Sequence, residues 1–189
     1  MNVALRKPMS LEQFLAWEER QELRYEFDGF QPLAMTGGTA GHAAIQRNLI
    51  TALATRLRGQ LCQVYGGELK IAVTGSIRYP DAFVVCSSIP RGATVVTGPV
   101  VVFEVLSPST SSTDHIVKNQ EYRDTPSIQR YVMLEQDRQG AIVFARSRDD
   151  WVGHVAAGDT VLHMPEIGVE LPLAELYEGV ALSEPEAEG

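Results

Sequence analysis

The sequence has few cysteines, no long apolar run and no strong secretion signal. Its 189 residues include two cysteines, Cys62 and Cys86, which are far apart and lie in or beside apolar runs. This pattern is typical of small buried hydrophobic residues and not of a zinc or redox pair. No run approaches the roughly 18 apolar residues that a membrane span needs, and no apolar segment follows the basic residues near the start of the chain. We therefore expect a cytoplasmic protein that does not bind a membrane.

Positive charge is also scarce, which restricts how the chain could bind nucleic acid. Lysine and arginine together number 16, against 24 aspartate and glutamate residues, and the formal net charge is −8. This balance argues against a broad basic surface of the kind that provides non-specific affinity for DNA. A nucleic-acid substrate would have to be held by a local basic patch or by a bound metal ion.

The length and composition predict a single domain. Hydrophobic residues make up 44% of the chain, enough to bury a sizeable core. No internal repeat or linker divides the sequence. We expect an ordered core over residues 10–177 and a disordered acidic tail over residues 184–189.

Apolar spacing, caps and turns predict an α/β protein with a central mixed sheet, flanking helices, and an N-terminal helix and hairpin. Ser10 and Gln13 form a capping-box pattern at the start of a helix over residues 11–21. Asp28 and Gly29 predict a two-residue type I′ turn. Further helices are expected at 42–59, 113–124 and 173–176, and strands at 24–27, 30–35, 62–65, 68–73, 77–86, 100–106, 129–135, 141–146, 151–156 and 160–164.

Two carboxylates interrupt β-rich apolar runs. Asp81 follows Pro80 within residues 77–85, and Glu104 lies within residues 100–107. A buried strand has little physical reason to carry such a group. Taken alone, an acid in a strand is more often paired with a basic neighbour or exposed at a sheet edge than catalytic.

Taken together, the two acids point to metal-dependent hydrolysis of a phosphodiester. That reaction uses a divalent ion with oxygen ligands to polarise the phosphoryl group and to lower the pKa of water. Asp81 and Glu104 can supply two carboxylates, and the backbone carbonyl of Val105 can supply a third oxygen. Lys118 on the following helix is the candidate to orient the water and offset the charge of the transition state, although its spacing alone favours an exposed helix residue.

The order of these motifs resembles the Uma2 family, a bacterial group once catalogued only as a domain of unknown function. The resemblance extends from about Ser10 to about Leu176. Its residues are the hairpin 25–29, His42, Pro80-Asp81, Glu104-Val105-Leu106-Ser107-Pro108-Ser109-Thr110, Asp114, Lys118 and Tyr122. The family is assigned to the PD-(D/E)xK restriction-endonuclease-like superfamily. The resemblance therefore implies that fold and a Mg²⁺- or Mn²⁺-dependent endonuclease acting on DNA.

The resemblance also implies roles for further residues. Leu106 occupies the position that usually holds the superfamily's lysine, and family members move this lysine to the next helix, where Lys118 lies. Glu26 is either a further catalytic or metal-binding carboxylate, or a surface residue of the hairpin. His42 either contacts phosphate beside the site or forms a local hydrogen bond. Tyr122 is expected to pack with its hydroxyl group toward the site.

The sequence is also compatible with two other functions. Leu106 at the lysine position and the acidic balance would also suit a nuclease-like fold that has lost turnover and acts as a binding or assembly module. The same ligands would also serve a hydrolase of another phosphoester. By analogy with restriction-like enzymes, exposed strands in the carboxy-terminal half permit a homodimer.

Overall fold

The structure is a computed structural model that describes residues 8–35, 37–106, 112–148 and 150–182. Its helices are α1 (Leu11–Glu18), α2 (Ala40–Arg56), α3 (Ser112–Asp124), the 3-10 helix η1 (Pro165–Ile167) and α4 (Leu173–Leu176). Within the described residues, none of the helices has both the length and the apolar character needed to cross a membrane.

The strands form two larger sheets and a separate hairpin. Their bounds are β1 (Tyr25–Phe27), β2 (Pro32–Ala34), β3 (Gln63–Gly66), β4 (Lys70–Val73), β5 (Ser76–Arg78), β6 (Ala82–Val85), β7 (Val95–Val96), β8 (Pro99–Val105), β9 (Arg130–Leu134), β10 (Gly140–Ser147), β11 (Asp150–Ala157), β12 (Val161–Met164) and β13 (Val169–Pro172). The larger sheets have the orders β11-β10-β9-β8-β6-β3 and β2-β1-β5-β4-β7. Each contains one parallel pair among antiparallel ones, β8 with β9 and β4 with β7. The mixed α/β architecture confirms the predicted fold class.

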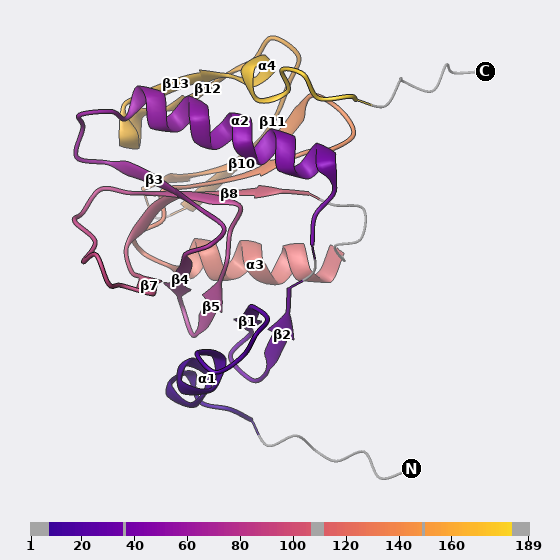
Figure 1. Cartoon of the computed structure of the whole chain (residues 1–189). Coiled ribbons are helices and arrows are strands. Elements are labelled where there is room, and N and C mark those ends of the chain that lie inside the picture. The colour runs from indigo at the N-terminus through magenta and orange to yellow at the C-terminus, as the bar shows by residue number, and fades with distance from the viewer. Residues whose placement is uncertain (1–7, 36, 107–111, 149, 183–189) are drawn as a thin grey trace.

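Helices α2 and α3 cover opposite faces of the six-stranded sheet (Figure 1). Successive side chains of a strand point to opposite faces, and β8 shows this alternation clearly. Val101 and Phe103 pack in a buried cluster with Leu49 of α2, whereas Val102 packs in a second cluster with Tyr122 of α3. The strand that carries Glu104 is thus buried on both sides.

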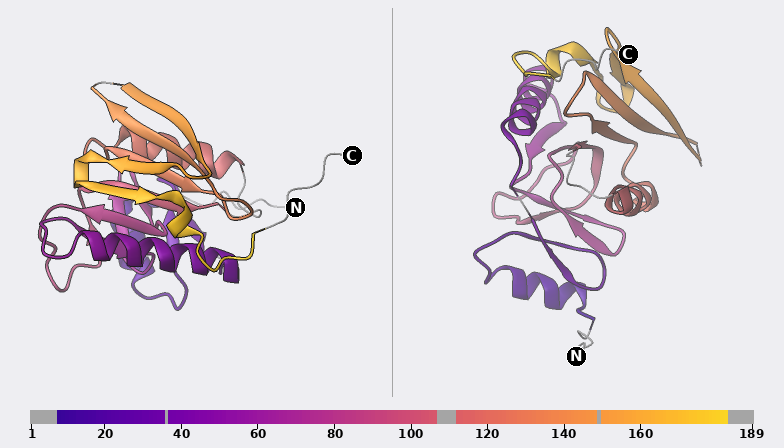
Figure 2. Two further views of the ribbon diagram at one scale, coloured as in Figure 1. Left: turned by 90° about the horizontal axis from the view of Figure 1, so that it is seen from above. Right: turned by 90° about the vertical axis from the view of Figure 1, so that its right-hand side faces the viewer.

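The five-stranded sheet packs against α1. The predicted capping box is present, because the Gln13 amide donates to Ser10 Oγ and the Ser10 amide donates to Gln13 Oε1. The Phe14 ring of α1 stacks on Phe27 of β1, with 4.9 Å between the ring centroids. Figure 2 shows α1 at the end of the molecule opposite β11.

The single strand predicted over residues 77–86 is wrong, and the difference decides where Asp81 lies. The run divides into β5 and β6, which belong to different sheets. Pro80 separates them, because proline has no amide hydrogen for a strand ladder and restricts the residue before it. Asp81 therefore lies at the crossover from the five-stranded sheet to the six-stranded sheet.

The N-terminal hairpin exists, but its two-residue turn is also wrong. Phe27 pairs with Pro32, so residues 28–31 form the loop. The Asp28 carboxylate accepts hydrogen bonds from the amides of Phe30 and Gln31, each at 2.8 Å, and Gly29 has a positive φ of 90°. An aspartate that bonds to the following backbone favours this wider loop.

The two cysteines form a disulfide, so the prediction of two separate hydrophobic residues is wrong. Cys62 precedes β3 and Cys86 follows β6, and the pairing of Gln63 with Val85 brings the cysteines opposite each other. They are 24 positions apart in the sequence. This partnership depends on the pairing of β3 with β6, which is not visible from cysteine spacing.

Two short strands, β7 and β13, were not predicted. Residues 107–110 of the family motif, the side chain of Asp114 and the tail over residues 184–189 lie outside the part of the chain that the structure describes.

Candidate active site

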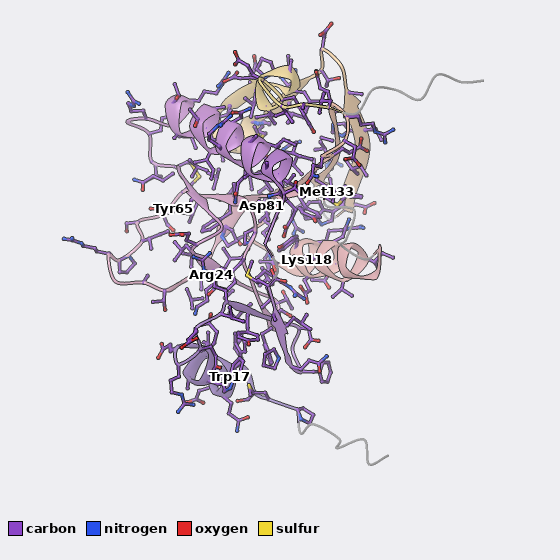
Figure 3. All side chains as sticks on the ribbon, turned by 45° about the vertical axis from the view of Figure 1, so that its right-hand side comes forward. Trp17, Arg24, Tyr65, Asp81, Lys118 and Met133 are labelled. Carbon is purple, nitrogen blue, oxygen red and sulfur yellow. A yellow bond between two sulfur atoms is a disulfide. The ribbon has the colours of Figure 1, made fainter. Side chains whose placement is uncertain are left out.

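The predicted site residues come from four separate elements that meet between α2 and α3. Asp81 lies at the crossover before β6, Glu104 near the end of β8, Lys118 on α3 and Glu26 on β1. Figure 3 shows Asp81 and Lys118 in the region between the two helices. Because Ala82 pairs with Phe103, Asp81 lies beside the end of β8 that carries Glu104.

The amine of Lys118 lies between two carboxylates. Its Nζ is 3.3 Å from Oε1 of Glu26 and 3.5 Å from Oε1 of Glu104. The side chain of Lys118 is only 11% exposed, so the alternative of a solvent-exposed helix residue is wrong. Glu26 is also buried, which excludes the surface position on the hairpin.

Both oxygens of Glu26 are held by donors. Arg78 Nη1 lies 3.2 Å from Oε2, and the Tyr79 amide donates to Oε1 at 3.0 Å. Lys118 contacts the same Oε1 atom. Glu26 is therefore oriented toward Lys118 by the backbone and side chains of the chain segment that leads to Asp81.

Arg78 is a fully buried residue of the site that the sequence analysis missed. Its Nε and Nη2 atoms donate to the two oxygens of Glu121 at 2.7 and 2.8 Å, and Ser76 Oγ donates to Glu121 at 2.7 Å. Burial alone would lower the pKa of Arg78, but the carboxylates of Glu121 and Glu26 raise it. The signal was present in the sequence, since an arginine in the apolar run before Pro80 is as anomalous as Asp81.

Asp81 is oriented by groups from α2 and β8. The Val105 amide donates to Oδ2 at 2.7 Å, and His42 Nε2 lies 3.2 Å from the same oxygen. Gln46, one turn further along α2, donates to the carbonyl oxygen of Asp81 at 2.8 Å. The hydrogen bond to the Asp81 carboxylate raises the pKa of His42. The sequence analysis expected His42 near the site but missed Gln46.

A close backbone approach also holds Asp81 in place. A Cβ atom on Gly67, in the turn after β3, would lie 3.4 Å from the carbonyl oxygen of Pro80 and 3.3 Å from Nε2 of Gln46. Glycine therefore allows the turn to pack directly on the Pro80-Asp81 backbone. A larger residue would push against two groups that position Asp81.

Glu104 is the buried carboxylate at the centre of the site. Tyr122 Oη donates to its Oε1 at 2.8 Å. Burial raises the pKa of Glu104 to about 7, the charge of Lys118 opposes this shift, and the nearby carboxylates of Asp81 and Glu26 add to it. Burial also raises the pKa of Tyr122, so its hydroxyl stays protonated and remains a donor.

Position 106, two residues after Glu104, holds a leucine, so the amine near Glu104 comes from a helix instead. Leu106 packs partly buried against the apolar cluster that includes Tyr122, Tyr131 and Met133. Leu106 and Glu104 are two positions apart and point to the same face of β8, which α3 covers. Lys118 therefore approaches Glu104 from α3, the helix that covers this face.

The donor set fits a hard divalent cation. Asp81 and Glu104 offer carboxylate oxygens, and the carboxylates of Glu26 and Glu121 lie nearby in ion pairs with Lys118 and Arg78. A divalent ion would offset the negative charge of Asp81 and Glu26, which adds to the effect of burial on the pKa of Glu104. In the described residues, no three His, Cys, Asp or Glu side chains are grouped to hold a metal. Mg²⁺ commonly uses one or two carboxylates, with water and substrate phosphate completing its coordination.

Comparison with known proteins identifies similar chains. A family model, Uma2, described as "Putative restriction endonuclease", matches residues 11–174. Two uncharacterized proteins of Synechocystis sp. are similar to this chain. The protein slr1290 is 32% identical over 177 residues, which cover 92% of this chain and 93% of the relative. The protein sll1609 is 27% identical over 141 residues, which cover 72% of this chain and 80% of the relative.

A solved structure has the same fold. It is a crystal structure of a protein from Anabaena variabilis, described as a "putative nuclease belonging to DUF820". It superposes with a TM-score of 0.76 at 21% sequence identity, and the match covers 92% of this chain and all of the other. The predicted nuclease-type arrangement of sheet and helices is therefore confirmed.

Proposed function

Because the chain belongs to the Uma2 family, we propose that it is a Mg²⁺- or Mn²⁺-dependent endonuclease that hydrolyses phosphodiester bonds in DNA. The descriptions of the family and of the Anabaena protein support nuclease chemistry. The observation that carries the proposal is the contact of Lys118 with Glu26 and Glu104 beside Asp81. Packing alone does not explain a lysine that lies between two buried carboxylates, because burying charged groups costs free energy.

In this proposal Asp81, Glu104 and the backbone carbonyl of Val105 hold the metal ion. When bound, the ion polarises the phosphoryl group and lowers the pKa of the attacking water. His42, Gln46 and the Val105 amide keep the Asp81 carboxylate in one orientation. Tyr122 does the same for Glu104 by occupying one side of its Oε1 atom.

Lys118 is the proposed group that orients the attacking water and offsets the negative charge that develops on the phosphoryl oxygens. Its ammonium group must stay protonated, and two adjacent carboxylates favour the charged form. Glu26 has both oxygens occupied by Arg78, the Tyr79 amide and Lys118. We therefore assign Glu26 to holding Lys118 rather than to binding the metal.

The proposed partners are DNA and a second copy of the chain. Strand β11 is the last strand of the six-stranded sheet, and the described residues place no strand on its outer side. Val155 on this strand is 72% exposed. An exposed edge strand can pair with an identical one, and light scattering of the purified protein tests whether it does.

Cleavage assays with supercoiled, linear and single-stranded DNA test the function. We expect cleavage with Mg²⁺ or Mn²⁺ and none with EDTA. Asp81→Asn, Glu104→Gln and Lys118→Met should each remove it, whereas Asp159→Asn, at an exposed turn position, should not. Failure of the wild-type protein to cut any of these substrates would sink the proposal.

Calorimetric titration with Mn²⁺ separates the proposal from its alternatives. A module that has lost its metal site would show no heat of binding that depends on Asp81 and Glu104. A hydrolase of another phosphoester would bind Mn²⁺ through the same residues and leave DNA intact. It would then release a nucleotide or another phosphomonoester from smaller phosphodiesters.

A further inference from the structure

Arg78 connects the five-stranded sheet to helix α3 through a single buried side chain. It belongs to β5 of the five-stranded sheet, and its guanidinium group contacts Glu26 on the neighbouring strand β1. The same group binds Glu121 on α3, the helix that covers the six-stranded sheet. Every nitrogen of the guanidinium group faces a carboxylate oxygen, at distances of 2.7, 2.8 and 3.2 Å.

Lys118 needs such a connection because it does not lie on a strand. A lysine two positions after Glu104 would be fixed by the same strand as the acid. The position of the Lys118 amine instead depends on how far α3 is shifted along its axis and how it is rotated about that axis. Glu121 follows Lys118 by three positions, so the two side chains lie on the same face of the helix. A contact that fixes Glu121 therefore fixes the direction from which Lys118 approaches Glu104.

We propose that Arg78 and Glu121 form a clamp that positions Lys118 and Glu26 relative to Glu104, an inference that rests on the proposed function. Arg78 and Glu121 are positioning residues, since neither contacts Glu104 in any described hydrogen bond or ion pair. The clamp holds both Glu26 and the helix that carries Lys118. One arm of Arg78 holds Glu26, and the other two hold the helix that carries Lys118.

The chemistry of the clamp favours positioning over stability. Replacing a buried ion pair by apolar residues of similar volume is often neutral or stabilising. Two parallel hydrogen bonds from a planar guanidinium group, however, define an orientation that an ammonium group or an apolar pair cannot define. Ser76 Oγ adds a third donor to Glu121 and restricts its carboxylate further.

A second buried ion pair, between helix α1 and the same sheet, provides a matched control. Lys70 and Glu18 are 2.5 Å apart, with side chains 6% and 7% exposed, and they join α1 to β4. Tyr79 Oη also donates to Glu18. This pair resembles the clamp in burial and charge, and among the described residues its hydrogen bonds and ion pairs involve Tyr79 and not α3.

The closing experiment compares Arg78→Met/Glu121→Met with the control Lys70→Met/Glu18→Met. Arg78→Lys and Ser76→Ala provide milder changes if the double variant is poorly folded. At temperatures well below each melting midpoint, the clamp variant should lose about tenfold to a hundredfold in kcat. Its KM for DNA and its Kd for Mn²⁺ should stay within about threefold of wild type, because Asp81 and Glu104 are retained. The control should keep the wild-type kcat.

A readout without catalysis keeps this test separate from the test of the proposed function. Lys7, Lys70 and Lys118 are the lysines of the chain. Reductive methylation with ¹³C-formaldehyde therefore gives few lysine resonances, which Lys7→Arg and Lys118→Arg variants assign. In the clamp variants the Lys118 resonance should move toward the position of an exposed lysine, and in the control it should not.

The two kinds of failure can be distinguished. If the wild-type protein cleaves none of the DNA substrates, the proposed function is wrong, whatever the lysine resonances show. A Lys118 resonance that is unchanged in folded Arg78→Met/Glu121→Met and Arg78→Lys overturns the clamp, as does a wild-type kcat in those variants.

Discussion

The Nζ atom of Lys118 lies 3.5 Å from Oε1 of Glu104, although one residue belongs to α3 and the other to β8. The chain between them includes residues 107–111, which carry part of the family motif and lie outside the described structure. The amine that the superfamily usually places on the strand is thus present at the same carboxylate from another element. Position 106 on the strand holds a leucine that packs in an apolar cluster.

Because the amine comes from α3 and not from the strand, we expect that a lysine on the strand can partly replace Lys118. Lys118→Met should reduce DNA cleavage at least about a hundredfold, because no other described cation contacts both Glu26 and Glu104. Adding Leu106→Lys to this variant should restore part of the activity, since position 106 points to the same face of β8. Initial rates of plasmid cleavage measure both effects. Equal rates for wild type and Lys118→Met would remove Lys118 from the mechanism.

Glu104 predicts how the stability of the metal-free protein changes with pH. Its pKa is raised from 4.5 to about 7 in the folded protein. The folded state therefore binds a proton that the unfolded state has released between these values, and stability falls as pH rises through this range. The loss is at most about 3 kcal/mol. Glu104→Gln should flatten this part of the profile, as measured by denaturant unfolding in EDTA from pH 4.5 to pH 8. The same slope in wild type and variant would contradict the assignment.

Metal binding should show the opposite pH dependence. A carboxylate must be deprotonated to bind a metal ion, and burial keeps Glu104 partly protonated near pH 7. Mn²⁺ should therefore raise the melting temperature more at pH 8 than at pH 6. Asp81→Asn and Glu104→Gln should lose this increase, and Asp159→Asn should keep it. An increase that survives both acid substitutions would place the metal elsewhere on the protein.

The disulfide predicts a stability effect that does not reach the site. Cys62 and Cys86 close a loop with a sequence separation of 24, for which chain entropy suggests about 3 kcal/mol of stabilisation. Cys62→Ala/Cys86→Ala should lower the free energy of unfolding by about this amount. Cleavage at 25 °C should be retained, because Asp81 precedes the opposite end of β6. Thiol titration of the unfolded wild-type protein without reductant should detect no free thiol.

Local patterns predicted most of the fold. The capping box of Ser10, the apolar spacing of α2 and the apolar run of β8 each depend on neighbouring residues, and all three are present. The errors occur where long-range contacts compete with local preference. The run before Cys86 looks like one strand, but Pro80 and a change of sheet divide it. The bond between Cys62 and Cys86 likewise depends on strand pairing.

Residue types and their spacing along the chain specify the groups available to the site. These are Asp81 and Glu104 in apolar runs, a lysine on the next helix, and a leucine at the strand position. Local sequence patterns and the resemblance to the family are enough to predict them. Packing between distant elements buries Glu26, brings its Oε1 atom to Lys118, and joins β5 to α3 through Arg78, and none of this is visible in the order of the residues. Charges interact strongly when folding buries them close together, and that closeness arises from pairings between elements far apart in the chain.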